Sequence, residues 1–152
     1  MATAAEQAEF DNSLRLYTYR HVVATGRAPA VAQAAAEMGS NEAAVRAGYA
    51  RLSESRAFML TESGELWRVA PFSAVPTAFP VESGGHTYYA NCIWDALGIP
   101  AALGQDATIP ASCACCNLEM MLRVKAGSLL GHEGLVHVAV PASRWYEDVA
   151  FT

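Results

Sequence analysis

Two residues of the sequence, Cys92 and Asp95, have types and a spacing that could support chemistry together. Both fall in the segment 86–100, which we interpret as one short buried helix. Because an α-helix has about 3.6 residues per turn, side chains three residues apart project from neighbouring positions on one face. A thiolate is a soft nucleophile and metal ligand, and a carboxyl group can hold and deliver a proton. The spacing therefore predicts a nucleophile and a proton carrier side by side.

The other three cysteines of the chain, Cys113, Cys115 and Cys116, are crowded into one short stretch. Such crowding does not resemble the spread disulfide framework of a secreted domain, and it indicates free thiols in a reducing compartment. Cys113 and Cys116 have the Cys-x-x-Cys spacing of half a zinc site, which His132 and His137 could complete. Because His137 falls in a predicted strand and His132 in a glycine-rich stretch, zinc is the weaker interpretation, and a packed or thiol-reactive turn is the stronger one.

The composition of the 152 residues indicates a folded globular protein. Hydrophobic residues make up 53% and charged residues only 16%, which excludes a disordered chain. No apolar run approaches the roughly 18 to 20 residues that cross a bilayer, and the N-terminus lacks a basic segment followed by an apolar one. We therefore expect a soluble, cytoplasmic protein that does not contact a membrane. The net charge of −5 gives no sign of a surface that would grip a polyanion.

Residues 1–70 are predicted to form a lobe of three helices and a β-hairpin. The first two helices each end at a glycine, Gly26 and Gly39, which is a common helix-ending residue. The helices are expected over residues 9–25, 30–38 and 42–52. Two β-prone runs around a short polar turn predict the hairpin over 58–69. This order of elements is that of a winged helix-turn-helix.

A winged-helix order raises the question of DNA binding through the third helix. That helix offers Arg46 and Arg51, but it also carries Glu42, and residues 1–80 hold seven arginines against eight acidic residues. A near-neutral lobe gives little attraction to phosphates. We therefore favour a structural lobe over a DNA-binding or partner-binding one.

Residues 71–85 are expected to be an extended proline-rich connector, because three prolines within its first ten residues exclude a helix. The domain that follows, 86–152, begins with the helix that carries Cys92. Its strands are expected over 107–110, 118–124 and 135–140. The three crowded cysteines fall between the first two strands, and hence at the end of a hairpin. A helical turn that enters a further strand is expected over 142–152, and the predicted fold class is α+β with mostly antiparallel strands.

The run from Tyr89 to Gly104, followed at the appropriate distance by Cys113, resembles the core motif of the alkylmercury lyase (organomercurial lyase) family. The segments 136–141 and 145–149 resemble the C-terminal half of the broader family. By this resemblance the chain is identified as a divergent or C-terminally truncated member, with an alkylmercury-lyase-like domain over 86–152 that is incomplete at its end.

The resemblance implies protonolysis of a carbon–mercury bond without an organic or metal cofactor. It assigns Cys92 as the thiolate that takes the mercury, Asp95 as the proton shuttle and Cys113 as a structural thiol. Burial of Asp95 among apolar neighbours such as Trp94 would favour its protonated form. The implied substrate is a small organomercurial or another small apolar molecule, and the Hg(II) product would leave to cellular thiols or to a mercury-accepting protein.

The family mechanism uses a second cysteine, which would be expected just beyond Thr152, where the sequence ends. Cys115 and Cys116 are the available substitutes as mercury ligands beside Cys92. The alternative function is a non-catalytic protein that binds a soft metal ion (Hg, Cu or Zn) through its thiols, or a sensor in which the winged-helix-like lobe meets DNA or a partner.

Overall fold

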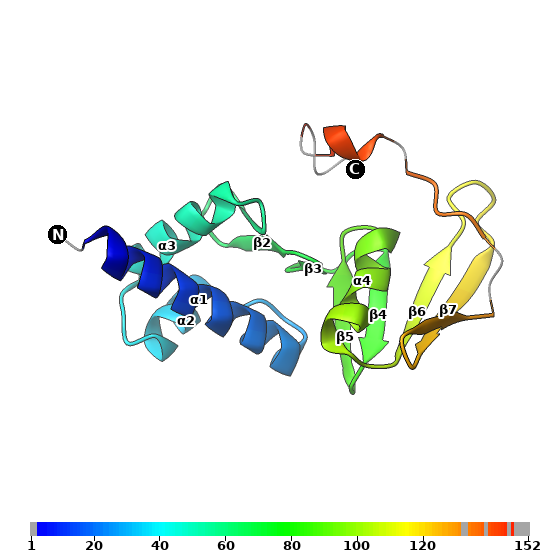
Figure 1. Cartoon of the computed structure of the whole chain (residues 1–152), viewed down its shortest axis with the longest axis horizontal. Coiled ribbons are helices and arrows are strands. Elements are labelled where there is room, and N and C mark those ends of the chain that lie inside the picture. The colour runs from blue at the N-terminus through cyan, green and yellow to red at the C-terminus, as the bar shows by residue number, and fades with distance from the viewer. Residues whose placement is uncertain (1–2, 132–133, 139, 146, 148–152) are drawn as a thin grey trace.

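The computed structural model describes residues 3–131, 134–138, 140–145 and 147. Three helices come first: α1 (Ala4–Thr25), α2 (Val31–Glu37) and α3 (Glu42–Glu54). They pack together at one end of the molecule, and α4 (Ile93–Leu103) lies over a sheet towards the other end (Figure 1). The three predicted N-terminal helices are thus confirmed, although the name winged helix stays a prediction.

The described strands form one antiparallel sheet, so the predicted α+β class is confirmed. Along the sheet the order is β1-β2-β3-β5-β4-β6-β7-β8. The strands are β1 (Phe58–Leu60), β2 (Leu66–Val69), β3 (Phe72–Ser73), β4 (Phe79–Ser83), β5 (His86–Ala90), β6 (Ala107–Ser112), β7 (Glu119–Lys125) and β8 (Ser128–Leu130). The predicted hairpin over 58–69 corresponds to β1 and β2, and the predicted strands over 107–110 and 118–124 correspond to β6 and β7.

The predicted connector, residues 71–85, is extended as expected but is not only a connector. It contains β3 and β4, and β4 pairs with β5 on one side and with β6 on the other. The sheet therefore runs without interruption from the N-terminal hairpin into the second part of the chain. The apolar core is likewise shared, and its fully buried members come from both parts: Leu14, Tyr49, Phe58, Val69, Val81, Ile99 and Ile109.

The end of α1 rests directly on β5. Gly26 closes the helix with a left-handed backbone, φ 72°, and its amide donates to the Val22 carbonyl. The Tyr88 hydroxyl donates to the Val23 carbonyl at 2.8 Å. A Cβ atom on Gly26 would lie 2.9 Å from the Thr87 carbonyl oxygen. The absence of a side chain at Gly26 therefore permits both the helix end and the contact with β5.

Replacing Gly26 with alanine is expected to lower the free energy of unfolding by about 2 to 5 kcal/mol. The left-handed backbone costs an L-residue roughly 1–2 kcal/mol, and overpacking against the backbone of β5 adds about 1–3 kcal/mol. Gly39 is the matched control, because it has φ 59° but a Cβ atom there would meet nothing within 4 Å. Urea unfolding of Gly26→Ala and Gly39→Ala measures the difference, and equal losses in both variants would contradict the close contact with β5.

The predicted helix over 86–100 is wrong in its first half. Residues 86–90 form β5, paired with β4 from Phe79↔Ala90 to Ser83↔His86, and α4 begins at Ile93. The reason lies in the alternation of side chains: Tyr88 and Ala90 are buried while Thr87 is exposed, which is the period of a strand. Cys92 therefore lies at a junction between a strand and a helix, and not inside a helix.

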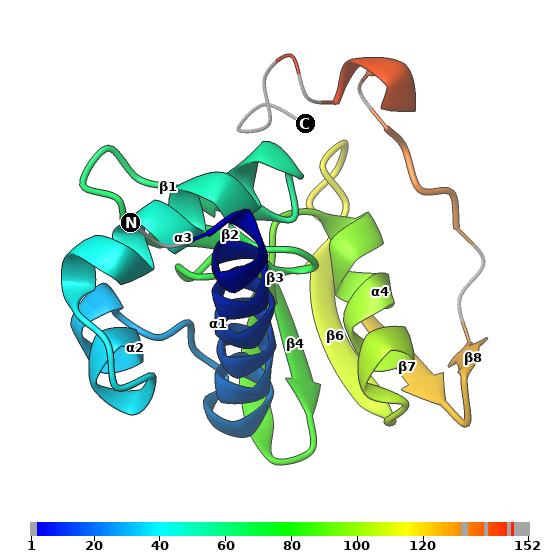
Figure 2. The same cartoon turned by 60° about the vertical axis from the view of Figure 1, so that its left-hand side comes forward.

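α4 covers one face of the central strands, and no helix of the described residues lies over their opposite face (Figure 2). Ile99 of α4 is fully buried, as are Val81 of β4 and Ile109 of β6 on the covered face. Among the described residues, no helix is long and apolar enough to cross a membrane.

The predicted buried strand over 135–140 is wrong for the described residues. Residues 134–138 form neither helix nor strand, and Leu135 is 99% exposed. The predicted helical turn after Pro141 corresponds to η1, a 3₁₀ turn over Ala142–Arg144. The strand predicted beyond it falls mostly on residues outside those described.

Candidate functional site: a thiol and a carboxylate at the start of α4

Asp95 lies in the first turn of α4 and is only 9% exposed. Its Oδ2 atom accepts two hydrogen bonds, from Nη2 of Arg68 at 3.1 Å and from Nδ2 of Asn91 at 3.3 Å. A buried carboxylate requires such partners, because an unpaired charge away from water is costly. Both bonds end on Oδ2, and no hydrogen bond from a described residue is seen at Oδ1.

Cys92 is the N-cap residue of α4. Its backbone is extended, with φ −151° and ψ 175°, and its carbonyl accepts from the Ala96 amide at 2.9 Å. The side chain is half-buried and makes no capping hydrogen bond to the helix. Cys92 and Asp95 therefore occupy the N-cap and N3 positions, although the Cys92 side chain does not make the bond to the N3 backbone amide that defines a capping box. The partial positive charge of a helix N-terminus suits two groups that act as anions.

Arg68 is a site residue that the sequence analysis missed. It comes from β2 in the N-terminal lobe, its side chain is 15% exposed, and it forms an ion pair with Asp95. Its Nε atom is buried, with no hydrogen-bond partner among the described residues. The signal that could have found it is an arginine inside the short apolar strand Leu66–Val69, where a charge needs a partner.

Trp94 does not wall in the pair as expected. Its side chain is 62% exposed, although it directly follows the helix start that carries Cys92. Leu97 is half-buried and Ile99 is fully buried. The exposed indole is a large apolar surface on the first turn of α4.

The three crowded cysteines form the end of the β6–β7 hairpin, as the sequence predicted. The turn is closed by two backbone hydrogen bonds, from the Cys113 amide to the Leu118 carbonyl at 2.9 Å and from the Asn117 amide to the Cys113 carbonyl at 2.8 Å. Cys113 is half-buried, and Cys115 and Cys116 are exposed. Hydrogen bonds from the backbone amides of Cys115 and Cys116, followed by the Cys116 side chain, lower the pKa of the Cys113 thiol.

A family model described as alkylmercury lyase, MerB, matches residues 72–152, which is more than half of the chain. The chain belongs to the alkylmercury lyase family. The matched segment includes Cys92, Asp95 and the cysteine hairpin, while Arg68 lies just before it. The predicted family resemblance is therefore confirmed.

The solved structure of the mercury-bound form of MerB2 shares the fold of this alkylmercury lyase family member, with a TM-score of 0.60 at 20% identity. The similarity covers 84% of this chain and 66% of MerB2, so the chain spans just under two thirds of that protein. No curated protein sequence matches the chain.

The predicted set of mercury ligands in this family member, Cys92, Cys115 and Cys116, is not assembled as a three-ligand site. Within residues 3–131 and the described parts beyond, no three histidine, cysteine, aspartate or glutamate residues are grouped so that they could hold a metal ion. The zinc interpretation stays untested: His137 is exposed, and His132 lies outside the described residues.

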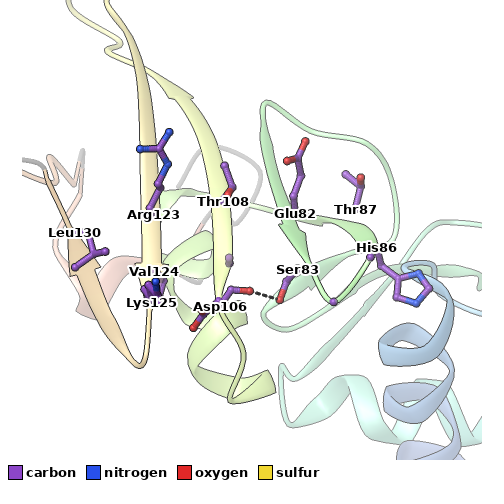
Figure 3. A pocket seen from close by; sticks show the side chains of 13 residues that line it. Glu82, Ser83, His86, Thr87, Asp106, Thr108, Arg123, Val124, Lys125 and Leu130 are labelled. Carbon is purple, nitrogen blue, oxygen red and sulfur yellow. Dashed lines mark hydrogen bonds between the residues drawn. The ribbon is translucent and has the colours of Figure 1, made fainter.

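One cavity lies away from the reactive pair. It has a volume of about 610 Å³ and lies on the sheet face opposite α4, where Glu82, Thr108 and Arg123 form a row across β4, β6 and β7 (Figure 3). A second cavity, of about 470 Å³, is lined by the residues that flank the cysteine hairpin, Ser112 and Glu119 among them. Neither cavity is lined by Cys92 or Asp95.

Proposed function

We propose that the protein cleaves the carbon–mercury bond of a small organomercurial by protonolysis, with Cys92 as the mercury-binding thiolate and Asp95 as the proton shuttle. The observation that carries this proposal is the placement of a half-buried, uncapped thiol and a buried, anchored carboxyl group at the N-cap and N3 positions of one helix. The family membership supplies the reaction type.

The proposed reaction needs no oxidant or reductant. The Cys92 thiol gives up its proton to the Asp95 carboxylate, and the Cys92 thiolate forms a sulfur–mercury bond. The small thiol that carried the organomercurial leaves mercury as a thiolate and takes a proton from water. The proton on Asp95 then passes to the carbon, which takes the electron pair of the carbon–mercury bond and departs as a hydrocarbon. Hg(II) stays on the Cys92 sulfur, because soft thiolates outcompete oxygen and nitrogen ligands for soft ions.

Arg68 and Asn91 act in this scheme as positioning residues. Both donate hydrogen bonds to Oδ2 of Asp95, so the carboxyl group cannot rotate freely. In this scheme Oδ1 is the oxygen that accepts the proton and delivers it. A proton carrier is efficient only when it is held within hydrogen-bond reach of the reacting atom. The N-terminal lobe thus takes part in catalysis through β2, without touching the substrate.

The test is the release of benzene from phenylmercury by the purified chain in the presence of excess small thiol, followed by gas chromatography of the headspace. Benzene above the thiol-only blank is expected from the unmodified chain, and none above the blank from Cys92→Ser. The need for free thiols throughout supports a cytoplasmic location, with cellular thiols or a mercury-accepting protein taking up the product. An unmodified chain that captures phenylmercury but releases no benzene would overturn the lyase proposal.

The second candidate function is a non-catalytic soft-metal thiol-binding or sensor protein, which the three-cysteine hairpin favours. The DNA-binding form of this alternative is opposed by the ion pairs of the third helix. Arg46 pairs with Glu42 and Glu65, and Arg51 forms two 2.7 Å hydrogen bonds with Asp11. Guanidinium groups already neutralised by carboxylates give little attraction to phosphates. Tight Hg(II) binding without hydrocarbon release would support this candidate.

A further inference from the structure

We propose that the cavity on the sheet face opposite α4 is a binding site for a small zwitterion of the dipeptide class, with its ammonium group at Glu82 and its carboxylate at Arg123. The cavity has a volume of about 610 Å³ and is not lined by Cys92 or Asp95. The proposal therefore goes beyond the proposed lyase function and does not depend on it.

The registers of four strand pairs decide which side chains line this cavity. Thr87 pairs with Glu82, Glu82 with Thr108, Thr108 with Arg123, and Arg123 with Leu130. Directly paired residues project to the same face of a sheet. One row of side chains therefore crosses five strands, from β5 to β8, and all five of its members line the cavity.

Glu82 and Arg123 carry opposite charges that no described residue neutralises. Both residues are exposed, and among the described residues neither forms an ion pair or a side-chain hydrogen bond. Figure 3 shows the two side chains extending the same way from the sheet, with Thr108 between them. The row thus has a negative group and a positive group on either side of a hydroxyl.

The other charged groups of the cavity keep this polarity. Lys125 lies two residues beyond Arg123 on β7 and also lines the cavity, so it adds positive charge at that side. The Asp106 carboxylate accepts a hydrogen bond from the Ala126 amide at 2.8 Å. Two carboxylates, of Glu82 and Asp106, stand against two cations in the lining, which favours a ligand without net charge over a simple anion or cation.

The separation of the two charges selects the length of the ligand. Adjacent strands are about 4.8 Å apart, so Glu82 and Arg123 lie roughly 10 Å apart across β6. An extended chain spans about 3.5 Å per residue, so a dipeptide of about 7 Å laid along the row reaches both groups with a hydrogen bond at each end. A single amino acid would require both side chains to lean over Thr108. The Thr108 hydroxyl can donate to or accept from the central peptide group, and a guanidinium binds a carboxylate through two parallel hydrogen bonds.

The site is tested by titrating glycylglycine into the isotope-labelled full chain and following the backbone amide signals of Thr87 and Thr108 by NMR. Low ionic strength is used, because salt screens exposed charges. Saturable shifts with a dissociation constant of about 1 mM are expected for so small a ligand. N-acetylglycylglycine lacks the ammonium group and glycylglycinamide lacks the carboxylate, so each is expected to bind about 5- to 20-fold more weakly. No saturable shift with glycylglycine, or equal binding of the three probes, would overturn the proposal.

Two variants assign the ends of the ligand. Glu82→Gln is expected to weaken glycylglycine about 5- to 20-fold and to leave N-acetylglycylglycine unchanged, whereas Arg123→Gln does the same for glycylglycine and leaves glycylglycinamide unchanged. Glu119→Gln is the matched control, because Glu119 is an exposed carboxylate of β7 that does not line this cavity. All three changes are at exposed positions, where substitutions rarely disturb a fold. Equal losses for every probe, or the same loss in Glu119→Gln, would mean that surface charge in general attracts the probes and would overturn the assignment.

Discussion

Asp95→Asn is expected to slow the release of hydrocarbon by about 10²- to 10⁴-fold while mercury capture by Cys92 is retained. General acid–base catalysis by a positioned side chain contributes this much to a rate. Asparagine has nearly the same shape as aspartate and can still accept a hydrogen bond from Arg68, but it cannot carry the proton. The carboxyl group of Asp95 is buried and held by Arg68 and Asn91. Water from the bulk solvent is therefore not expected to take over the delivery of the proton.

The measurement separates capture from cleavage. Capture is followed by the loss of one titratable thiol on mixing with phenylmercury, and cleavage by benzene in a single turnover. Cys92→Ser serves as the contrast, because it is expected to lose both signals. Asp95→Asn that loses capture and cleavage to the same extent would sink the proton-shuttle role. Thermal unfolding of each variant identifies the temperature range in which both are folded.

The N-terminal elements could be predicted because their signals are local. Gly26 ends α1 through its left-handed backbone, and the turn at Gly64 joins β1 and β2, so the residues that decide these boundaries are adjacent in the sequence. The segment 86–100 could not be read so simply. Tyr88 and Tyr89 fit a helix face as well as a strand, and the choice was made by pairing with β4, a contact that local pattern does not reveal.

The C-terminal strand prediction failed for a related reason. The run from Leu135 to Val140 is β-branched and apolar, which predicts a strand, but a strand needs a partner with free backbone groups. Among the described residues, Leu135 and Val138 are exposed. The segment has a high strand propensity, but its described residues pair with no other strand. Composition alone could not distinguish the two outcomes, because propensity for a strand describes a fit to a half-buried surface.

The candidate site divides along the same line. Cys92 and Asp95 could be named from the sequence because they are only three positions apart, so the local backbone decides how they lie relative to each other. Arg68 stands 27 positions before Asp95 and in another lobe, and its part in the site depends on how β2 meets the start of α4. The sequence supplied the chemical groups of the site, and the tertiary structure supplied the charge that holds one of them.

Arg68→Met is expected to lower the free energy of unfolding by about 2 to 3 kcal/mol and to slow cleavage, because it leaves the buried carboxylate of Asp95 without its charged partner. Loss of a hydrogen bond to a charged group costs about 1.5–3 kcal/mol, and breaking a fully buried ion pair about 3–5 kcal/mol. The side chains of Arg68 and Asp95 are 15% and 11% exposed, so the pair is not fully buried and the expected loss lies in the upper part of the range for a hydrogen bond to a charged group. Urea unfolding measures the loss.

Two further variants separate a positioning role from a merely structural one. Arg68→Lys keeps the charge but not the planar guanidinium geometry, so it is expected to retain most of the stability while cleavage still falls and capture by Cys92 stays intact. In a double-mutant cycle, Arg68→Met and Asp95→Asn are expected to be non-additive by about 0.5–3 kcal/mol in the free energy of unfolding, as for residues in direct contact. Additive effects, or an Arg68→Lys variant with unchanged cleavage, would mean that Arg68 only stabilises the contact between β2 and α4. The guanidinium would then have no part in aiming the carboxyl group of Asp95 at the reacting carbon.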